Sequence, residues 1–212
     1  MFEFEIGEAA CKYLYIQRGE VAGIKEFEPW KRAYEDSIDA IYQSIKSYIR
    51  PDIKRTLDIG SGLGGINAVL NRHVGGGLHV NLLDGESDLP VVERHNKTFN
   101  DMQTARDFLF DNGVMNLSTH DPMTYEESLS GEFDLITSFA SYGFHVHPKT
   151  YILLCRRRAA LNGIMVFDVR RTPGDEWLTL FSEEFGPPTV VAEGKKYQRC
   201  VFHPSNRSQP TC

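Results

Sequence analysis

Short apolar runs alternate with segments of helical periodicity along most of the chain. Apolar residues recur at helical spacing from Trp30 to Ile49, which predicts one long helix before Pro51. The later pattern predicts strands at 57–59, 78–83, 114–117, 132–138 and 163–169, helices at 66–70, 102–109, 149–161 and 177–185, and a hairpin at 188–192 and 197–202. Strands that alternate with helices form a parallel sheet covered on both faces. We therefore expect an α/β fold with a doubly wound, mostly parallel sheet and an antiparallel C-terminal hairpin.

The first 53 residues precede this alternation. Phe2, Phe4 and Ile6 alternate with glutamates, which predicts a short strand. An apolar cluster at 13–16 is either a cap over a ligand site or a packing extension. We expect an N-terminal extension and helix that pack on the core (1–53), one main domain (54–203) and a polar, frayed tail (204–212).

Composition limits the partners and the location. The chain has 212 residues, a net charge of −6 and a pI of about 5.6. This acidity argues against a nucleic-acid partner, because phosphate binding needs a basic surface. The four cysteines form no Cys-x-x-Cys pair, so neither a zinc knuckle nor a redox motif is expected. The N-terminus is acidic and no apolar run reaches the length of a membrane span, so we expect a cytoplasmic protein without a membrane partner.

A glycine-rich turn follows the first predicted strand. That strand contains Asp58 and runs into Gly60, Gly62, Gly64 and Gly65 before a helix begins. We call residues 60–65 the glycine loop. Glycines let the backbone approach a ligand, and a helix start offers free N–H groups, so the loop predicts a nucleotide-type site. Its spacing fits both Gly-x-Gly-x-x-Gly, which is typical of dinucleotide sites, and Asp-x-Gly-x-Gly-x-Gly. Asp58 favours the second pattern, because a carboxylate repels a pyrophosphate and suits a cationic ligand.

In this second form, the stretch resembles the first motif of class I S-adenosylmethionine-dependent methyltransferases, Asp/Glu-x-Gly-x-Gly-x-Gly. The resemblance covers residues 54–203 and implies a Rossmann-like sheet of about seven strands. It also implies S-adenosylmethionine as methyl donor and S-adenosylhomocysteine as product. The implied cofactor-binding residues are Asp58, Gly60, Ser61, Gly62, Gly64, Asp84, Gly85, His120, Asp121 and Ser138.

Two aspartates carry specific expectations. Asp84 ends the second predicted strand about 20 residues past the glycines, where an acidic residue accepts the ribose hydroxyls of either cofactor. The alternative for Asp84 is an Asp-Gly turn. In the resembled family, an aspartate after the third strand accepts from the adenine amino group. Asp121 stands at the matching position beside His120, although Asp-Pro is also a common turn.

The segment after the fourth predicted strand carries the candidate catalytic residues. The Phe-Asp-Leu-Ile run at 133–136 resembles the family's fourth strand, and Tyr142, His145 and His147 follow it. A hydroxyl acceptor must lose a proton during methyl transfer, and a histidine with a pKa near its usual value of about 6.5 suits that role. We expect His145 to be the general base of an O-methyl transfer, with His147 in reserve. The alternatives are packing against the next helix and a His-x-His metal pair; the pair lacks nearby carboxylates, so no metal is expected.

Three further segments concern the acceptor. The run from Ser141 to Tyr151 also resembles a group of bacterial proteins assigned as sugar O-methyltransferases. Residues 86–100 show no clean period and form either a lid or a solvated loop. Arg170 follows the fifth predicted strand, where it is a candidate for binding an anionic substrate group.

The prediction is therefore an S-adenosylmethionine-dependent methyltransferase that acts on a small-molecule acceptor, by O-methylation, with a sugar as one candidate. A second hypothesis is a non-catalytic S-adenosylmethionine-binding or scaffold protein of the same fold. The polar cluster at 142–147 favours an enzyme. An NAD-dependent oxidoreductase is a third hypothesis, which Asp58 opposes. The sequence does not predict the oligomeric state.

Overall fold

A seven-stranded sheet forms the centre of the computed structural model, which describes residues 2–14, 27–85, 102–171 and 176–204. The strands are β1 (Arg55–Ile59), β2 (His79–Leu83), β3 (Asn116–His120), β4 (Phe133–Ser138), β5 (Ala159–Arg170), β6 (Thr189–Glu193) and β7 (Tyr197–Phe202). They lie in the order β3-β2-β1-β4-β5-β7-β6. The first five strands pair in parallel, and β7 pairs antiparallel with both β5 and β6. This confirms the predicted mostly parallel sheet with an antiparallel C-terminal hairpin.

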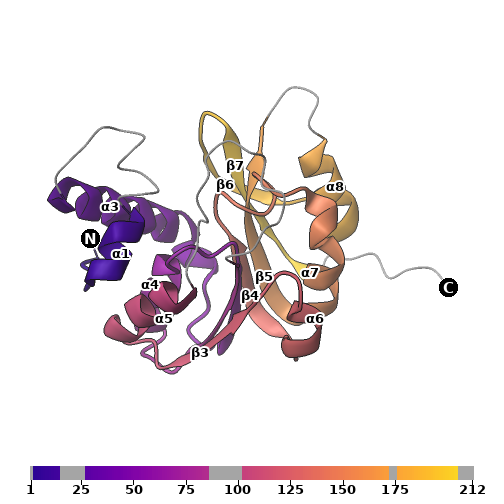
Figure 1. Ribbon diagram of the computed structural model, residues 1–212. Coiled ribbons are helices and arrows are strands. Elements are labelled where there is room, and N and C mark those ends of the chain that lie inside the picture. The colour runs from indigo at the N-terminus through magenta and orange to yellow at the C-terminus, as the bar shows by residue number, and fades with distance from the viewer. Residues whose placement is uncertain (1, 15–26, 86–101, 172–175, 205–212) are drawn as a thin grey trace.

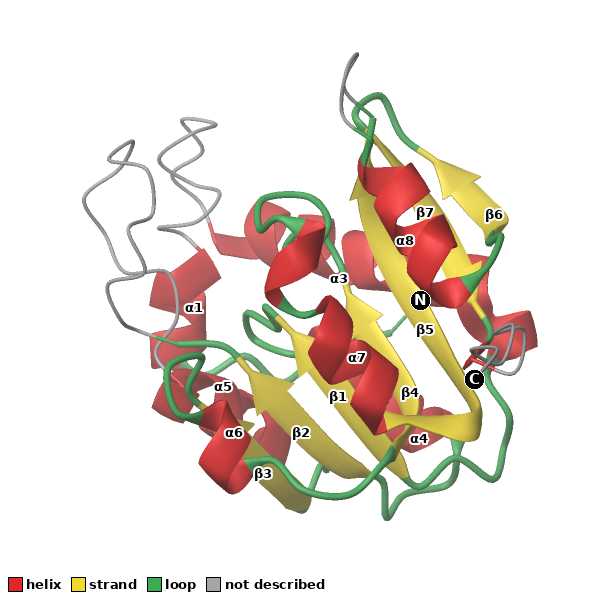
Figure 2. Cartoon of the chain, turned by 90° about the vertical axis from the view of Figure 1, so that its right-hand side faces the viewer, coloured by secondary structure: helices red, strands yellow, loops and turns green. Residues whose placement is uncertain are grey.

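Helices cover both faces of the sheet (Figure 1). One face carries α1 (Glu8–Leu14), α3 (Phe27–Ile45), α4 (Gly65–His73) and α5 (Met102–Asp111). The other face carries α6 (Tyr125–Ser128), α7 (Ile152–Arg158) and α8 (Trp177–Phe185), which lie in front of the sheet in Figure 2. Each layer encloses its own hydrophobic core. Two short 3₁₀ helices, η2 (Lys46–Tyr48) and η3 (Pro148–Thr150), follow α3 and precede α7.

The strand predicted at residues 2–6 does not form. The Phe4 N–H donates to Glu35 Oε1 at 2.9 Å, and the Glu5 N–H donates to Asn112 Oδ1 at 3.1 Å. Side chains of the helical layer thus take the place of a neighbouring strand as hydrogen-bond partners. The apolar side of this segment still faces inward, since Phe4 is buried in the core.

Two other predicted elements are displaced. The helix predicted at 149–161 ends at Arg158, and Ala159 already belongs to β5, where it pairs with Phe133 of β4. Pairing with a neighbouring strand overrides the helix propensity of alanine and leucine at this point. The third strand lies at Asn116–His120, two residues later than its predicted start. The predicted lid at 86–100, part of the apolar cluster at 13–16 and the tail beyond Pro204 lie outside the described residues.

Candidate functional site

The glycine loop connects β1 to α4 at the carboxyl end of the parallel strands, where ligands of such sheets bind. Positive φ angles of 69°, 56° and 74° occur at Gly60, Gly62 and Gly64, and residues with a Cβ rarely adopt this region. The Gly62 N–H donates to Asp84 Oδ2 at 2.9 Å, and the Gly65 N–H donates to the Tyr34 hydroxyl at 3.1 Å. Side chains from β2 and α3 therefore fix the shape of the loop, while Gly60, Ser61 and Gly62 stay partly exposed.

The structure brings four predicted cofactor residues together in one cavity of about 510 Å³. This cavity lies at the carboxyl ends of β2 and β3, and its lining includes Asp84, Gly85, His120 and Asp121. Asp84 also accepts from the Gly85 N–H at 2.9 Å, and Asp121 accepts from the Met123 N–H at 2.7 Å. Each aspartate therefore stabilises a turn, as the alternative interpretation predicted. Both carboxylates also line the same cavity. Its volume falls in the range of small-molecule sites.

His120 contributes the buried side of that cavity. Its Nε2 lies 3.1 Å from Asn81 Oδ1, and its Nδ1 lies 2.8 Å from the Ser128 hydroxyl. Burial, together with the charges of His79 and Arg55, lowers the pKa of the ring. The imidazole therefore acts as a neutral link between β2, β3 and α6, and through them it shapes the cavity.

Asp58 lies inside the protein, with 2% of its surface exposed. One carboxyl oxygen accepts from Asn67 Nδ2 at 2.7 Å, and the other accepts from the Thr137 hydroxyl at 2.9 Å. Burial raises the pKa of the carboxyl to about 7, and the charge of Asp84 adds to this rise while the two hydrogen bonds oppose it. Asp58 thus ties α4 to β1 and β4. Its contacts are with these side chains, so any influence on a cationic ligand acts through its field.

Ser138 and Tyr142 also have their polar atoms occupied inside the protein. The Ser138 hydroxyl donates to the Ile59 carbonyl at 2.6 Å and accepts from the Tyr142 N–H at 2.9 Å. The Tyr142 hydroxyl donates to the Pro148 carbonyl at 2.7 Å. Because the ring is fully buried, the pKa of Tyr142 is raised far above its usual range. These contacts favour structural roles for both residues.

The turn at 139–147 carries His145 and packs directly on the glycine loop. The Ser141 side chain occupies the space that a Cβ on Gly60 would need. The Ser141 carbonyl accepts from the His145 N–H at 2.7 Å. His145 keeps part of its surface in contact with solvent, and its ring lies 4.7 Å from the Phe144 ring. Partial burial and the charge of Arg170 lower the pKa of His145, so the imidazole is neutral near pH 7 and able to accept a proton.

His147 has a different environment. Its Nδ1 accepts from the Lys149 N–H at 3.2 Å, so the side chain caps η3. The ring centroid also lies 5.6 Å from that of Trp177 on α8. These contacts match the capping alternative for His147, whereas His145 carries no such capping bond among the described residues.

Sequence reasoning missed two residues beside the glycine loop. One is Ser141, which packs against Gly60. The other is Tyr13 of α1, whose hydroxyl oxygen lies 3.1 Å from the position that a Cβ on Gly62 would take. The apolar cluster at 13–16 was the available signal for Tyr13, and its interpretation as a cap over a ligand site fits this contact.

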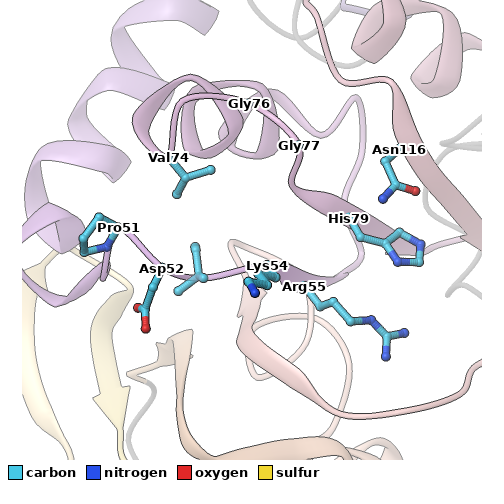
Figure 3. Close-up of a pocket in the computed structure, with 10 residues that line it drawn as sticks. Pro51, Asp52, Lys54, Arg55, Val74, Gly76, Gly77, His79 and Asn116 are labelled. Atoms are coloured by element: carbon cyan, nitrogen blue, oxygen red, sulfur yellow. The ribbon is translucent and has the colours of Figure 1, made fainter.

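A second cavity, of about 420 Å³, lies at the opposite, amino ends of β1, β2 and β3 (Figure 3). Its lining includes Lys54, Arg55, His79 and Asn116. None of the predicted site residues lines this second cavity, and neither does any residue of the glycine loop. Because ligands of open parallel sheets bind at the carboxyl ends, the first cavity is the better candidate site.

Neither a metal-binding cluster nor a membrane-spanning helix is observed in the described parts of the chain. No three His, Cys, Asp or Glu side chains there are grouped so that they could hold a metal ion. None of the helices there has the combination of length and apolar character that crossing a bilayer requires.

Comparisons with known proteins bear on the fold. No family model and no curated protein matches the sequence. Among solved structures, a ribosomal protein L11 methylase from Lactobacillus delbrueckii subsp. bulgaricus matches with a TM-score of 0.55 and 14% identity, over 76% of this chain and 75% of that one. The T. thermophilus 16S rRNA N2 G1207 methyltransferase, solved with AdoMet and guanosine, matches with a TM-score of 0.56 and 14% identity, over 77% of this chain and 42% of that one. A candidate O-methyltransferase from Klebsiella pneumoniae gives 0.52 and 17%, over 78% of each chain.

These neighbours are class I S-adenosylmethionine-dependent methyltransferases, and their named substrates include a protein and an RNA. At this level of identity the likeness concerns the fold. The chain therefore has the Rossmann-like fold of class I S-adenosylmethionine-dependent methyltransferases.

Proposed function

We propose that the protein transfers a methyl group from S-adenosylmethionine to an oxygen atom of a small-molecule acceptor. The observation that carries the proposal is the contact between Ser141 and Gly60, which joins the glycine loop to the turn bearing His145. Methyl transfer depends on alignment of donor and acceptor, and such positioning supplies a large part of the rate. A donor site and a candidate base that share one packed contact meet this requirement.

The residues around the loop fit the cofactor chemically. Glycines with positive φ leave backbone open to close approach by a ligand. Asp84 offers a carboxylate for the ribose hydroxyls, and Asp121 offers one for the adenine amino group across the same cavity. The fold neighbour solved with AdoMet supports this choice of cofactor.

When bound, the cofactor supplies an electrophilic methyl group on a sulfonium. His145 then accepts the proton of the acceptor hydroxyl, which its lowered pKa permits because the ring is already neutral at pH 7. The Phe144 ring, which lies 4.7 Å from the His145 ring and meets the Tyr197 ring edge to face at 6.4 Å, provides an aromatic group beside His145. A sugar or another ring-shaped acceptor could stack there, and sugars are therefore the first acceptors to examine.

Two measurements test the proposal. Calorimetry with S-adenosylmethionine, S-adenosylhomocysteine and NAD should show binding of the first two ligands; binding of NAD alone would overturn the cofactor assignment. A screen of sugars, phenols and carboxylic acids that follows S-adenosylhomocysteine release should then identify an acceptor. Cofactor binding without turnover of any acceptor would instead support a non-catalytic binding protein.

A further inference from the structure

A buried ion pair joins β5 to β7 close to the proposed site. Arg199 Nε lies 2.8 Å from Asp168 Oδ1, and a second guanidinium nitrogen lies 3.0 Å from Asp168 Oδ2. The two residues are direct cross-strand partners, and they are 4% and 3% exposed. A buried pair of this kind is weak evidence for stability, because well-packed apolar residues often replace it without loss. We therefore ask whether the pair holds the neighbouring backbone in one conformation.

Both members of the pair also contact the first residues after β4. The Arg199 guanidinium carbon lies 4.9 Å from the centroid of the Phe139 ring, and the backbone of Ala140 lies near enough to the Asp168 carboxylate to oppose the rise in its pKa. The third guanidinium nitrogen of Arg199 donates to the Ser44 hydroxyl on α3 at 3.0 Å. The pair thus connects the hairpin and α3 to the start of the 139–147 turn.

Ala140 has an unusual backbone conformation. Its φ is 53°, and it is the one non-glycine residue with positive φ in the described part of the chain. Residues with a Cβ adopt this region only where the surroundings impose it. The next residue is Ser141, which packs against Gly60 and accepts the backbone hydrogen bond of His145. The left-handed conformation of Ala140 therefore helps to set where Ser141 and His145 lie.

We propose that Asp168 and Arg199 are positioning residues, which hold Ala140 in its left-handed conformation and so fix the turn between the glycine loop and His145. The functional part of this inference rests on the proposed function, since the positioned residues are those of the methyl-transfer site. Its structural part is independent of any reaction.

The test uses the double variant Asp168→Leu/Arg199→Met, which replaces the pair by apolar residues of similar size. Hydrogen exchange should stay slow in β5 and β7, while amide exchange in residues 139–147 should rise about tenfold or more. The dissociation constant for S-adenosylmethionine should rise by about tenfold in the same variant, and by less than about threefold when Ala140→Gly is also present, because glycine adopts positive φ without being held there.

The control is Arg171→Met, which removes an exposed ion pair to Glu193 at 2.8 Å near the same strands and should change neither quantity. Unchanged exchange at 139–147 in the double variant would overturn the proposal, as would a loss of affinity that Ala140→Gly leaves intact. If the double variant does not fold, Arg199→Lys replaces it, because lysine cannot form the two paired bonds to Asp168. Amide exchange at 139–147 should then rise to a smaller extent, and exchange equal to that of the wild type would overturn the proposal. If the wild-type protein binds no S-adenosylmethionine, the proposed function fails while the exchange measurement still decides the positioning role.

Discussion

Replacing Asp58 by Asn removes a buried ionisable group while keeping the shape of the side chain. The amide oxygen of the new residue can still accept from the Thr137 hydroxyl, which now donates at 2.9 Å. Asn67 can turn its amide so that its oxygen accepts from the new amide nitrogen. The substitution therefore tests the charge of residue 58 with little change in packing.

The expected magnitude follows from the pKa of the carboxyl, which burial raises from 3.8 to about 7. A difference of this size corresponds to roughly 4 kcal/mol, at about 1.4 kcal/mol for each pKa unit. Below pH 3.8 the carboxyl is protonated in both the folded and unfolded states and contributes nothing. Between these two values the folded state holds a proton that the unfolded state has lost, so rising pH destabilises the wild-type protein. Asp58→Asn is free of this effect.

Urea unfolding at several pH values between 4 and 8 measures it directly. The stability of Asp58→Asn relative to wild type should increase toward high pH, by up to roughly 4 kcal/mol, and should level off above about pH 7. The control is Asp52→Asn, which removes an exposed carboxylate and should give a much smaller change. A stability difference that stays constant across this pH range would refute the conclusion that burial dominates over the two hydrogen bonds.

Three further substitutions test individual contacts. His145→Gln should lower turnover by about 10²–10⁴-fold while the S-adenosylmethionine affinity measured by calorimetry is retained, because a general base contributes to proton transfer and not to cofactor binding; near-normal turnover would contradict its role as base. Gly60→Ala should destabilise the protein by more than Gly76→Ala in chemical denaturation, since both glycines have positive φ but only the Gly60 substitution meets Ser141; equal losses would mean that the Ser141 contact is unimportant. Tyr142→Phe should cost about 1–2 kcal/mol of unfolding free energy through the unpaired Pro148 carbonyl, with turnover per folded molecule unchanged; a specific loss of turnover would return Tyr142 to the catalytic candidates.

Local sequence pattern was sufficient to locate most of the sheet and part of the site. Parallel strands bring their carboxyl ends to one edge, so Asp84 and Asp121 could be placed together once each was recognised as following a strand. The glycine spacing near Asp58 likewise predicted a turn that a side chain would obstruct, and the structure has positive φ at three of its glycines. In each case the relevant information lies within a few residues of the position concerned.

The remaining features depend on contacts between distant segments. The contacts of Tyr13 with Gly62, of Ser141 with Gly60 and of Asp168 with Arg199 join different elements, and no periodicity encodes them. The burial of Asp58 behind Asn67 and Thr137 likewise depends on contacts between different elements, and the local pattern carries no signal for it. At Ala159, strand pairing overrode a local helix preference.

Strand β7 lies inside the sheet, between β5 and β6, although it follows both in the sequence. While the chain is being synthesised, the side of β5 that β7 will cover is an open strand edge, and Asp168 has no Arg199 to pair with. Synthesis of residues 171–202 takes on the order of seconds at roughly 5–20 residues per second. An open strand edge is a template for association with other chains. Until β7 is added, other chains can pair with this edge, and a chaperone that bound it would prevent that.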